Sequence, residues 1–243
     1  MLSACSAPKM QATALPSSSA SIMPSLTPET AATAVPSNTP IPVTELCSPL
    51  LDHSFAELFD YITQPFIAPL GENRETGHHG VDIAYFHRAG DGPHIEGTTI
   101  QSVLNGQVAG FGYNPVYGNY IILESAAQFL PDSVVSLYSI EEGQSIYQLF
   151  AHMEEPTSFV LGDNVECAMI VGRVSDSGDQ FFVSDPHLHF EIRVGPADIQ
   201  FGPMSFYDTL ASEQEKAEYM FWRTDASFAL HDPMLLINLA AEN

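Results

Sequence analysis

One short stretch of the chain alternates strictly between apolar and polar side chains. Residues 187–194 read HLHFEIRV. Because side chains alternate between the two faces of a β-strand, this pattern predicts a strand with one apolar face and one polar face. The polar face carries His187, His189, Glu191 and Arg193. The stretch therefore predicts a sheet that packs one face on a core and presents ligand-type side chains on the other.

The folded part is predicted to be mainly β. Beyond Pro65 the chain consists of short runs rich in Ile, Val, Tyr and Phe, separated by Gly, Pro, Asn and Asp, which is typical of strands joined by turns. Asn105 and Gly106 lie between two such runs, 99–103 and 107–111, and predict a tight hairpin. Further strands are expected at residues 119–124, 145–153, 169–174 and 187–194.

Two segments favour helices. Residues 50–61 have the spacing of a short amphipathic helix, and Ser54 with Glu57 three residues later forms a capping box. Residues 212–222 read SEQEKAEYMFW and have helical propensity. We expect this second segment to pack on the sheet as an excursion of the same domain.

The first 46 residues differ in composition from the remainder. Residues 6–45 are mostly Ser, Thr, Ala and Pro and contain no aromatic residue, so they bury too little apolar surface to fold. We expect residues 1–46 to form a disordered tether and residues 47–243 to form one folded domain. Cys5 ends a four-residue match to a bacterial lipobox and is a candidate lipid anchor. The preceding parts of a signal peptide are missing, so either the start is assigned too late or the match is chance.

The charge balance excludes one class of partner. The chain has 30 acidic residues against 7 Lys and Arg, a formal net charge of −23. A nucleic-acid partner is not expected, because binding to a phosphate backbone requires clustered basic groups. No run approaches the roughly 18 apolar residues of a membrane-spanning helix, so an integral membrane protein is not expected either.

Two further cysteines remain if Cys5 is an anchor. Cys47 and Cys167 predict one disulfide that closes a long loop in an exported protein. Two buried free thiols are the alternative. Neither cysteine has the spacing of a cysteine metal site.

A second motif combines histidine and aspartate with strand alternation. Residues 77–85 read GHHGVDIAY, and as a strand this stretch places His78 and Asp82 on one face, with Gly80 between them. His79 lies on the opposite, apolar face, and we expect it to be structural. If this strand meets the HLHFEIRV strand, two imidazoles and one carboxylate could hold a metal ion and leave a fourth position for water, as in catalytic zinc sites. Taken separately, each motif is also compatible with ordinary surface histidines.

Three motifs in order resemble those of the lysostaphin and LytM-type zinc metallopeptidases, which cut peptide bonds in bacterial peptidoglycan. They are HHGVD at 78–82, AHM at 151–153 and PHLHFEIR at 186–193. The resemblance extends from about residue 65 to residue 194, and DPM at 232–234 resembles the closing segment of the family. It implies a sandwich-like antiparallel β domain in the cell envelope, lipid-anchored or secreted, with one Zn²⁺ per chain and a peptidoglycan peptide as substrate. We expect a monomer.

The resemblance also implies roles for five residues by motif position. His78, Asp82 and His189 correspond to the zinc ligands. His152 and His187 correspond to catalytic histidines that do not bind the metal, one acting as general base and the other donating a hydrogen bond to the oxyanion. The sequence leaves open which histidine has which role.

The remaining polar residues near the motifs have less specific predictions. Glu191 and Arg193 either support a ligand imidazole or form a solvated salt bridge. The histidines outside the motifs are expected at the surface or the edge of the core: His53, His87, His94 and His231.

The chain also departs from the family. Residues 126–144, 180–185 and 195–227 lengthen three connections and are expected to rim the groove. Some relatives carry a tyrosine shortly before HxxxD that assists the oxyanion, but here residues 72–74 are Glu, Asn and Arg.

Three functions therefore follow from the sequence. The leading one is a zinc metalloendopeptidase. The first alternative is a non-catalytic LytM-type domain that binds cell-wall peptide or regulates a partner hydrolase. The second is an exported metal-binding module with an unrelated substrate, for which His152 would not be needed.

Overall fold

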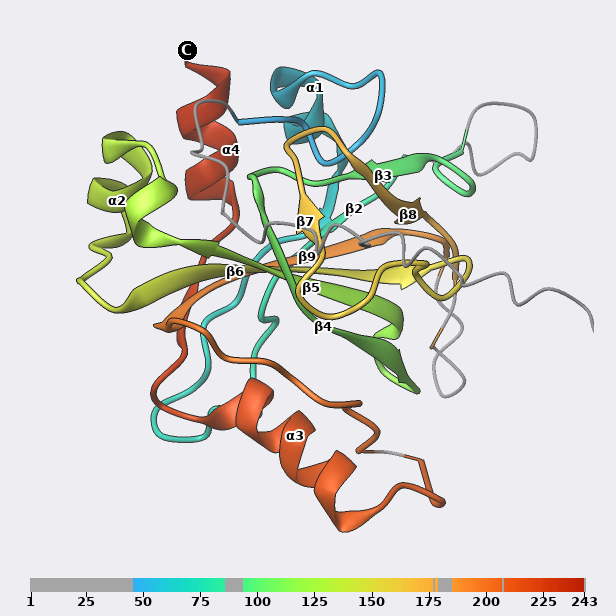
Figure 1. Ribbon diagram of the computed structural model, residues 1–243. Coiled ribbons are helices and arrows are strands. Elements are labelled where there is room, and N and C mark those ends of the chain that lie inside the picture. The colour runs from blue at the N-terminus through green and yellow to red at the C-terminus, as the bar shows by residue number, and fades with distance from the viewer. Residues whose placement is uncertain (1–45, 86–93, 177, 179–184, 207, 243) are drawn as a thin grey trace, which may run out of the picture. The chain divides into compact units, whose positions relative to one another are not determined.

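A computed structural model describes residues 46–85, 94–176, 178, 185–206 and 208–242 (Figure 1). Within these residues the main element is an eight-stranded sheet with the order β1-β2-β9-β6-β5-β4-β7, in which β10 also pairs with β9. All of its pairs are antiparallel. A second sheet joins β3 and β8. The predicted mainly β, antiparallel fold is confirmed, whereas the predicted tether and Cys5 lie outside the described residues.

Most strands overlap the predicted runs, but the GHHGVDIAY stretch is a strand only at residues 81–83, so the prediction of His78 within this strand is wrong. The strands are β1 (Ile62–Gln64), β2 (Val81–Ile83), β3 (Thr99–Gln101), β4 (Gly106–Asn114), β5 (Gly118–Ala126), β6 (Gln144–Met153), β7 (Asn164–Val165), β8 (Ile170–Arg173), β9 (Leu188–Pro196) and β10 (Ala229–His231).

The helices are short, and two of them, α1 and α3, lie in the segments predicted to be helical. They are α1 (Phe55–Tyr61), the 3₁₀ turn η1 (Ala127–Phe129), α2 (Asp132–Tyr138), α3 (Glu213–Thr224) and α4 (Met234–Ala241). The capping box of Ser54 and Glu57 is present, so α1 begins at Phe55 and not at Leu50, which instead bridges to Ile100. Among the described residues, no helix has the length and apolar composition needed to cross a membrane.

The large sheet lies between two apolar cores. One core contains alternate side chains of β9 together with buried residues of α1, α2 and α4. The other contains the opposite faces of β5 and β6 together with Tyr219 and Trp222 of α3. Figure 1 shows α3 on one side of the sheet and the other three helices toward the opposite side. The inserted segment thus packs on the sheet, as expected.

This arrangement buries both faces of β9. The predicted apolar face is confirmed, since its four side chains belong to the first core: Leu188, Phe190, Ile192 and Val194. The polar face points the other way, but Glu191 and Arg193 are both 0% exposed. The alternative of a solvated salt bridge is therefore wrong, because the second core and α3 cover this pair.

The predicted hairpin at Asn105 and Gly106 is also wrong. β3 pairs with β8, and β4 pairs with β5 and β7, so the chain passes from the small sheet to the large one at this point. A Cβ on Gly106 would lie 2.4 Å from the carbonyl oxygen of Glu124. Asn105 Oδ1 accepts a hydrogen bond from the Cys167 amide (2.6 Å). The glycine is needed for close packing of β4 on β5, and the asparagine holds a neighbouring loop.

A disulfide joins Cys47 to Cys167 across a sequence separation of 120 residues, with a Cα–Cα distance of 5.6 Å. The predicted pairing is confirmed. Such a bond restricts the unfolded chain, and the effect grows with the length of the closed loop. It fixes the beginning of the folded part to the loop before β8.

Replacing Cys47 and Cys167 together by serine is expected to lower the free energy of unfolding by about 2–4 kcal/mol. The measurement is denaturation by urea at equilibrium. Adding a reductant should destabilise the wild type by a similar amount and leave the double variant unchanged. Equal stability of the two proteins without reductant would contradict this expectation.

Candidate metal centre

Neighbouring strands bring three of the predicted residues together. In the β2–β9 pair, Asp82 lies directly opposite His189. His78 precedes β2 and pairs with Ile67 in an isolated bridge. Gly80 lets the segment before β2 lie close to β9, since a Cβ there would be 2.3 Å from the Phe190 carbonyl oxygen. Ligand-type atoms of His78, Asp82 and His189 consequently lie within 4.8 Å of one another.

These three side chains form a nearly regular triangle of ligand atoms. The separations are 3.0 Å from His78 Nε2 to Asp82 Oδ1, 3.2 Å from His78 Nε2 to His189 Nδ1, and 2.8 Å from His189 Nδ1 to Asp82 Oδ1. Ligands about 2.0–2.1 Å from a tetrahedral zinc ion lie about 3.3 Å from one another. The donor set and its dimensions fit one face of such a tetrahedron.

Each imidazole is fixed from behind by its second nitrogen. His78 Nδ1 lies 2.8 Å from the Pro65 carbonyl oxygen, to which it donates. His189 Nε2 donates to Glu191 Oε1 at 3.0 Å. Hydrogen bonds of this kind set the tautomer and the ring orientation of metal-binding histidines. They direct His78 Nε2 and His189 Nδ1 toward the shared space.

The electrostatics of the triangle favour a cation. Burial alone would raise the pKa of Asp82, but hydrogen bonds from His189 and His78 outweigh it and hold the pKa well below its usual range. Burial likewise opposes ionisation of Glu191, but the Arg193 charge and the His189 hydrogen bond keep its pKa low. Burial lowers the pKa of His189, whereas hydrogen bonds to Asp82 and Glu191 raise it to about 9. A metal ion would supply this positive charge in place of the proton on Nδ1.

The other two predicted histidines lie beside the triangle. The ring centroids of His152 and His187 are 4.3 Å apart, and those of His152 and His189 are 6.1 Å apart. His187 Nε2 lies 3.7 Å from Asp82 Oδ1, while its Nδ1 donates to the Asp185 carbonyl oxygen at 2.9 Å. All five predicted residues thus meet at one place.

An irregularity in β6 aims His152 at this place. Ala151 lies opposite His189 in the β6–β9 pair, so plain alternation would turn His152 to the other face. His152 instead has a φ of 59°, in the left-handed region, and the pairing of β5 with β6 shifts between Asn119 and Ile121. A β-bulge of this kind redirects a side chain, and such strain is common at functional sites.

The structure adds two residues for which the sequence predicted no role. Tyr117 donates from its hydroxyl to Glu191 Oε1 at 2.7 Å, and Arg223 NH1 lies 4.0 Å from the same oxygen. His79 has the expected structural place, since it is 0% exposed and Nε2 donates to the Thr76 carbonyl oxygen at 3.0 Å. Burial lowers the pKa of His79 to about 4, so its imidazole is neutral.

The described histidines outside the motifs are not part of the triangle. His53 packs against Tyr61 and Tyr85, and His231 packs against Tyr138. His94 is exposed. His87 and residues 180–184 lie outside the described residues.

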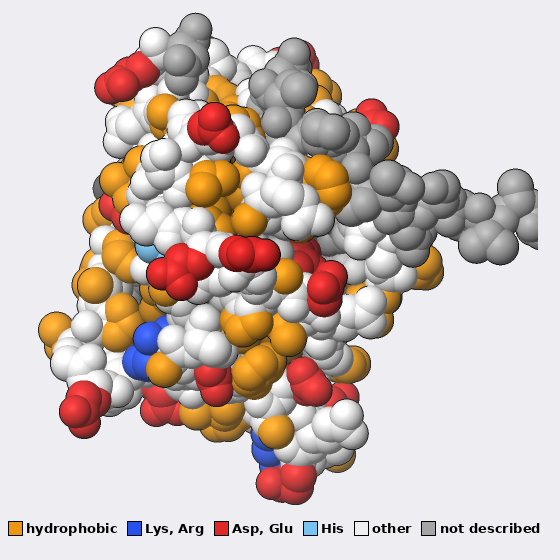
Figure 2. All heavy atoms as spheres, turned by 60° about the vertical axis from the view of Figure 1, so that its left-hand side comes forward, with side chains coloured by type: hydrophobic (Ala, Val, Ile, Leu, Met, Phe, Trp, Pro, Cys, Tyr) orange, Lys and Arg blue, Asp and Glu red, His pale blue; other side chains and the backbone are white. Residues whose placement is uncertain are grey.

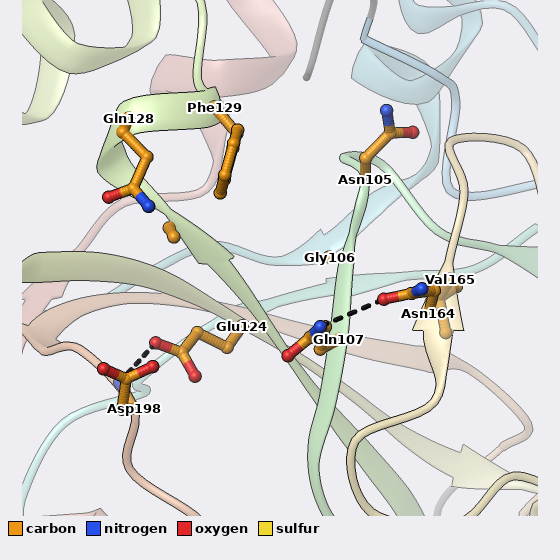
Figure 3. Close-up of a pocket in the computed structure, with 10 residues that line it drawn as sticks. Asn105, Gly106, Gln107, Glu124, Gln128, Phe129, Asn164, Val165 and Asp198 are labelled. Atoms are coloured by element: carbon orange, nitrogen blue, oxygen red, sulfur yellow. Dashed lines mark hydrogen bonds between the residues drawn. The ribbon is translucent and has the colours of Figure 1, made fainter. Parts of the chain in front are cut away.

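The pocket in Figure 3 is a separate feature. It is lined by residues of β4, β5, β7 and the η1 turn, and it contains none of the five predicted residues. Glu124 at its edge already accepts hydrogen bonds from the Asp198 amide (2.7 Å) and the Ser145 hydroxyl (2.7 Å). The metal-type cluster is therefore not part of this pocket.

Comparison of the chain with protein-family models gives no match, and comparison with curated proteins gives none either. Several solved structures are similar to it. LytM from Ruminococcus gnavus is 17% identical with a TM-score of 0.44, over 84% of this chain and 61% of that chain. The catalytic domain of lysostaphin from Staphylococcus simulans is 21% identical with a TM-score of 0.41, over 77% and 99%. The catalytic domain of the M23 protein EnpA from Enterococcus faecalis is 21% identical with a TM-score of 0.39, over 58% and 85%. These names belong to the family that the three motifs resemble.

Proposed function

We propose that the chain is a zinc metalloendopeptidase that hydrolyses peptide bonds in the stem or cross-bridge peptides of bacterial peptidoglycan. One observation carries the proposal. The triangle of His78, Asp82 and His189 has the dimensions of a three-ligand zinc site, and two further imidazoles lie beside it. The ordered motifs that resemble lysostaphin and LytM-type peptidases supply the substrate class.

The three triangle residues would hold the ion through His78 Nε2, an Asp82 carboxylate oxygen and His189 Nδ1. When bound, zinc polarises a scissile carbonyl and lowers the pKa of a water toward 7. The protein's own contribution is to hold the two ligand imidazoles in a fixed orientation. The Pro65 carbonyl oxygen accepts a hydrogen bond from His78, and the Glu191 carboxylate accepts one from His189.

His152 and His187 would handle the protons. His187 Nδ1 donates to the Asp185 carbonyl oxygen, so in the neutral imidazole the lone pair is on Nε2, which lies 3.7 Å from Asp82 Oδ1. This geometry favours His187 as the general base that takes a proton from the attacking water and returns it to the leaving amine. His152 would then donate a hydrogen bond to the developing oxyanion. The Glu, Asn and Arg at residues 72–74 provide no tyrosine for that task.

An extracytoplasmic location accords with this substrate. The disulfide of Cys47 and Cys167 is typical of oxidising compartments. We propose that the protein acts in the cell envelope, lipid-anchored at Cys5 or secreted. Mass spectrometry of the protein from its native host would decide, since an unmodified Cys5 rules out the anchor.

Removal of the metal by a chelator is expected to stop the release of peptide fragments from purified peptidoglycan, and added zinc should restore it. The chelated protein should also unfold at a lower temperature, because an ion that binds only the folded state stabilises it. Metal content and fragment release are measured on the same sample. A wild type that binds zinc but releases nothing from several peptidoglycan types would support the non-catalytic, peptide-binding alternative.

A further inference from the structure

A buried arginine lies directly behind the metal centre. Arg193 is 0% exposed, which is rare for arginine unless its charge is paired. Its guanidinium donates to Glu191 Oε2 from Nε at 3.0 Å and from NH2 at 2.7 Å. NH2 also donates to His79 Nδ1 at 3.1 Å, and NH1 donates to the Trp222 carbonyl oxygen.

Two of these partners adjoin residues of the triangle. The second carboxylate oxygen of Glu191 accepts the hydrogen bond from His189 Nε2 (3.0 Å). His79 directly follows His78 in the chain. One guanidinium therefore holds the carboxylate that fixes the His189 imidazole and also bonds to the residue next to His78.

The remaining partner belongs to α3. The Trp222 carbonyl lies in the last turn of this helix, where carbonyl groups have no partner within the helix. The Arg193 guanidinium carbon also lies 4.3 Å from the centroid of the Trp222 ring, within range of a cation–π contact. Arg193 thus joins the end of α3 to the strand that carries His189.

A second set of polar contacts connects α3 to the Glu191 carboxylate. Arg223 NH1 donates to the Tyr117 hydroxyl at 3.5 Å and lies 4.0 Å from Glu191 Oε1. The Tyr117 hydroxyl in turn donates to Glu191 Oε1 at 2.7 Å. Trp222 and Arg223 are consecutive residues of α3. The first is linked to Glu191 Oε2 through Arg193, and the second to Glu191 Oε1 through Tyr117. Basic side chains are scarce on the face shown in Figure 2. Arg193 and Arg223, two of the few arginines of the chain, belong to this network.

We propose that α3 controls the metal centre, and that Glu191, Arg193, Tyr117 and Arg223 are positioning residues that couple docking of the helix to metal affinity. The inference rests on the proposed zinc site. When α3 is docked, both oxygens of Glu191 are held, so the carboxylate fixes His189 with Nδ1 toward the triangle. Coupling of this kind is reciprocal. Metal binding must therefore tighten the docking of α3, and a weaker contact of α3 must weaken metal binding.

The test compares Arg223→Gln with Lys216→Gln, which removes the same charge from another position of the same helix, where the Lys216 side chain pairs with Glu213. Zinc affinity is measured by competition with a chromophoric chelator. We expect the dissociation constant of Arg223→Gln to rise about 10- to 100-fold, the usual effect of removing an outer partner of a metal site. Lys216→Gln should remain within about twofold of the wild type.

A second pair keeps the test decisive if Arg223→Gln does not fold. Tyr117→Phe removes the hydroxyl that donates to Glu191, and Tyr120→Phe removes a hydroxyl on the same side of the sheet that accepts from the Met204 amide (3.0 Å). Only Tyr117→Phe should weaken zinc binding. Hydrogen exchange gives an independent reading, since zinc should slow exchange of the α3 amides in the wild type and slow it less in Tyr117→Phe and Arg223→Gln.

The outcomes separate this inference from the proposed function. Unchanged zinc affinity in both folded variants, or no effect of zinc on α3 exchange, would overturn the coupling even if the wild type cleaves peptidoglycan. A wild type that binds zinc with the expected coupling but releases no fragments would leave the inference standing and remove the peptidase activity. Absence of zinc binding by the wild type would overturn the coupling.

Discussion

Asp82→Asn is expected to empty the metal centre and to reduce peptidoglycan cleavage to background. Asp82 Oδ1 is the corner of the triangle shared by both imidazoles, 3.0 Å from His78 Nε2 and 2.8 Å from His189 Nδ1. The amide keeps the shape of the side chain but removes its negative charge. Since loss of an outer partner alone costs about 10- to 100-fold in metal affinity, loss of a charged ligand should cost more than this.

Zinc content after dialysis and the zinc dissociation constant provide the measurement, together with fragment release. Asp60→Asn is the matched control, because Asp60 is an exposed carboxylate on α1; it should bind zinc and cleave as the wild type does. If Asp82→Asn holds zinc at wild-type affinity while folded, Asp82 is not a ligand and the proposed site is wrong.

His152→Asn is expected to keep the zinc and lose the reaction. Asparagine tolerates a positive φ better than most residues, so it should preserve the bulge that a φ of 59° requires. It cannot exchange a proton or present an imidazole to the oxyanion. We expect fragment release to fall by about 10²- to 10⁴-fold, the usual contribution of a positioned acid–base group, with zinc affinity and melting temperature near those of the wild type.

Initial rates of fragment release under saturating zinc measure this effect. His94→Asn serves as control, since His94 is an exposed histidine outside the motifs. A wild-type rate in His152→Asn would exclude His152 from the reaction. Loss of zinc together with activity would instead give this histidine a structural role at the metal.

Local alternation was enough to predict the apolar face of β9, because this face depends on neighbours in one strand. It also placed His78 beside Asp82, but His78 precedes β2 and is positioned by its bridge to Ile67. The abundance of strands and the cap at Ser54 followed from equally local patterns, whereas the antiparallel arrangement was implied by the family resemblance. The meeting of the two ligand strands was inferred from the ordered motifs, and the register of Asp82 opposite His189 accords with it.

Other features depend on contacts that are distant in sequence. Gly106 resembles a turn glycine, but its actual constraint is the backbone of β5. The sequence of β9 shows an acid and an arginine on the polar face, but only the packing of α3 determines that both are buried. The bulge that redirects His152 likewise arises from strand pairing and has no residue signature in the AHM motif.

The disulfide also has a consequence for the covalent topology of the protein. Cys47 and Cys167 close a ring of chain that contains His78, Asp82 and His152, whereas His187 and His189 lie on the open chain that follows. A single proteolytic cut anywhere within the ring leaves one connected molecule, with every residue of the triangle still linked to every other. Within the ring, two cuts, or one cut and reduction of the bond, are needed before a fragment can leave, whereas a single cut between Cys167 and His187 would separate His189 from the other two residues of the triangle.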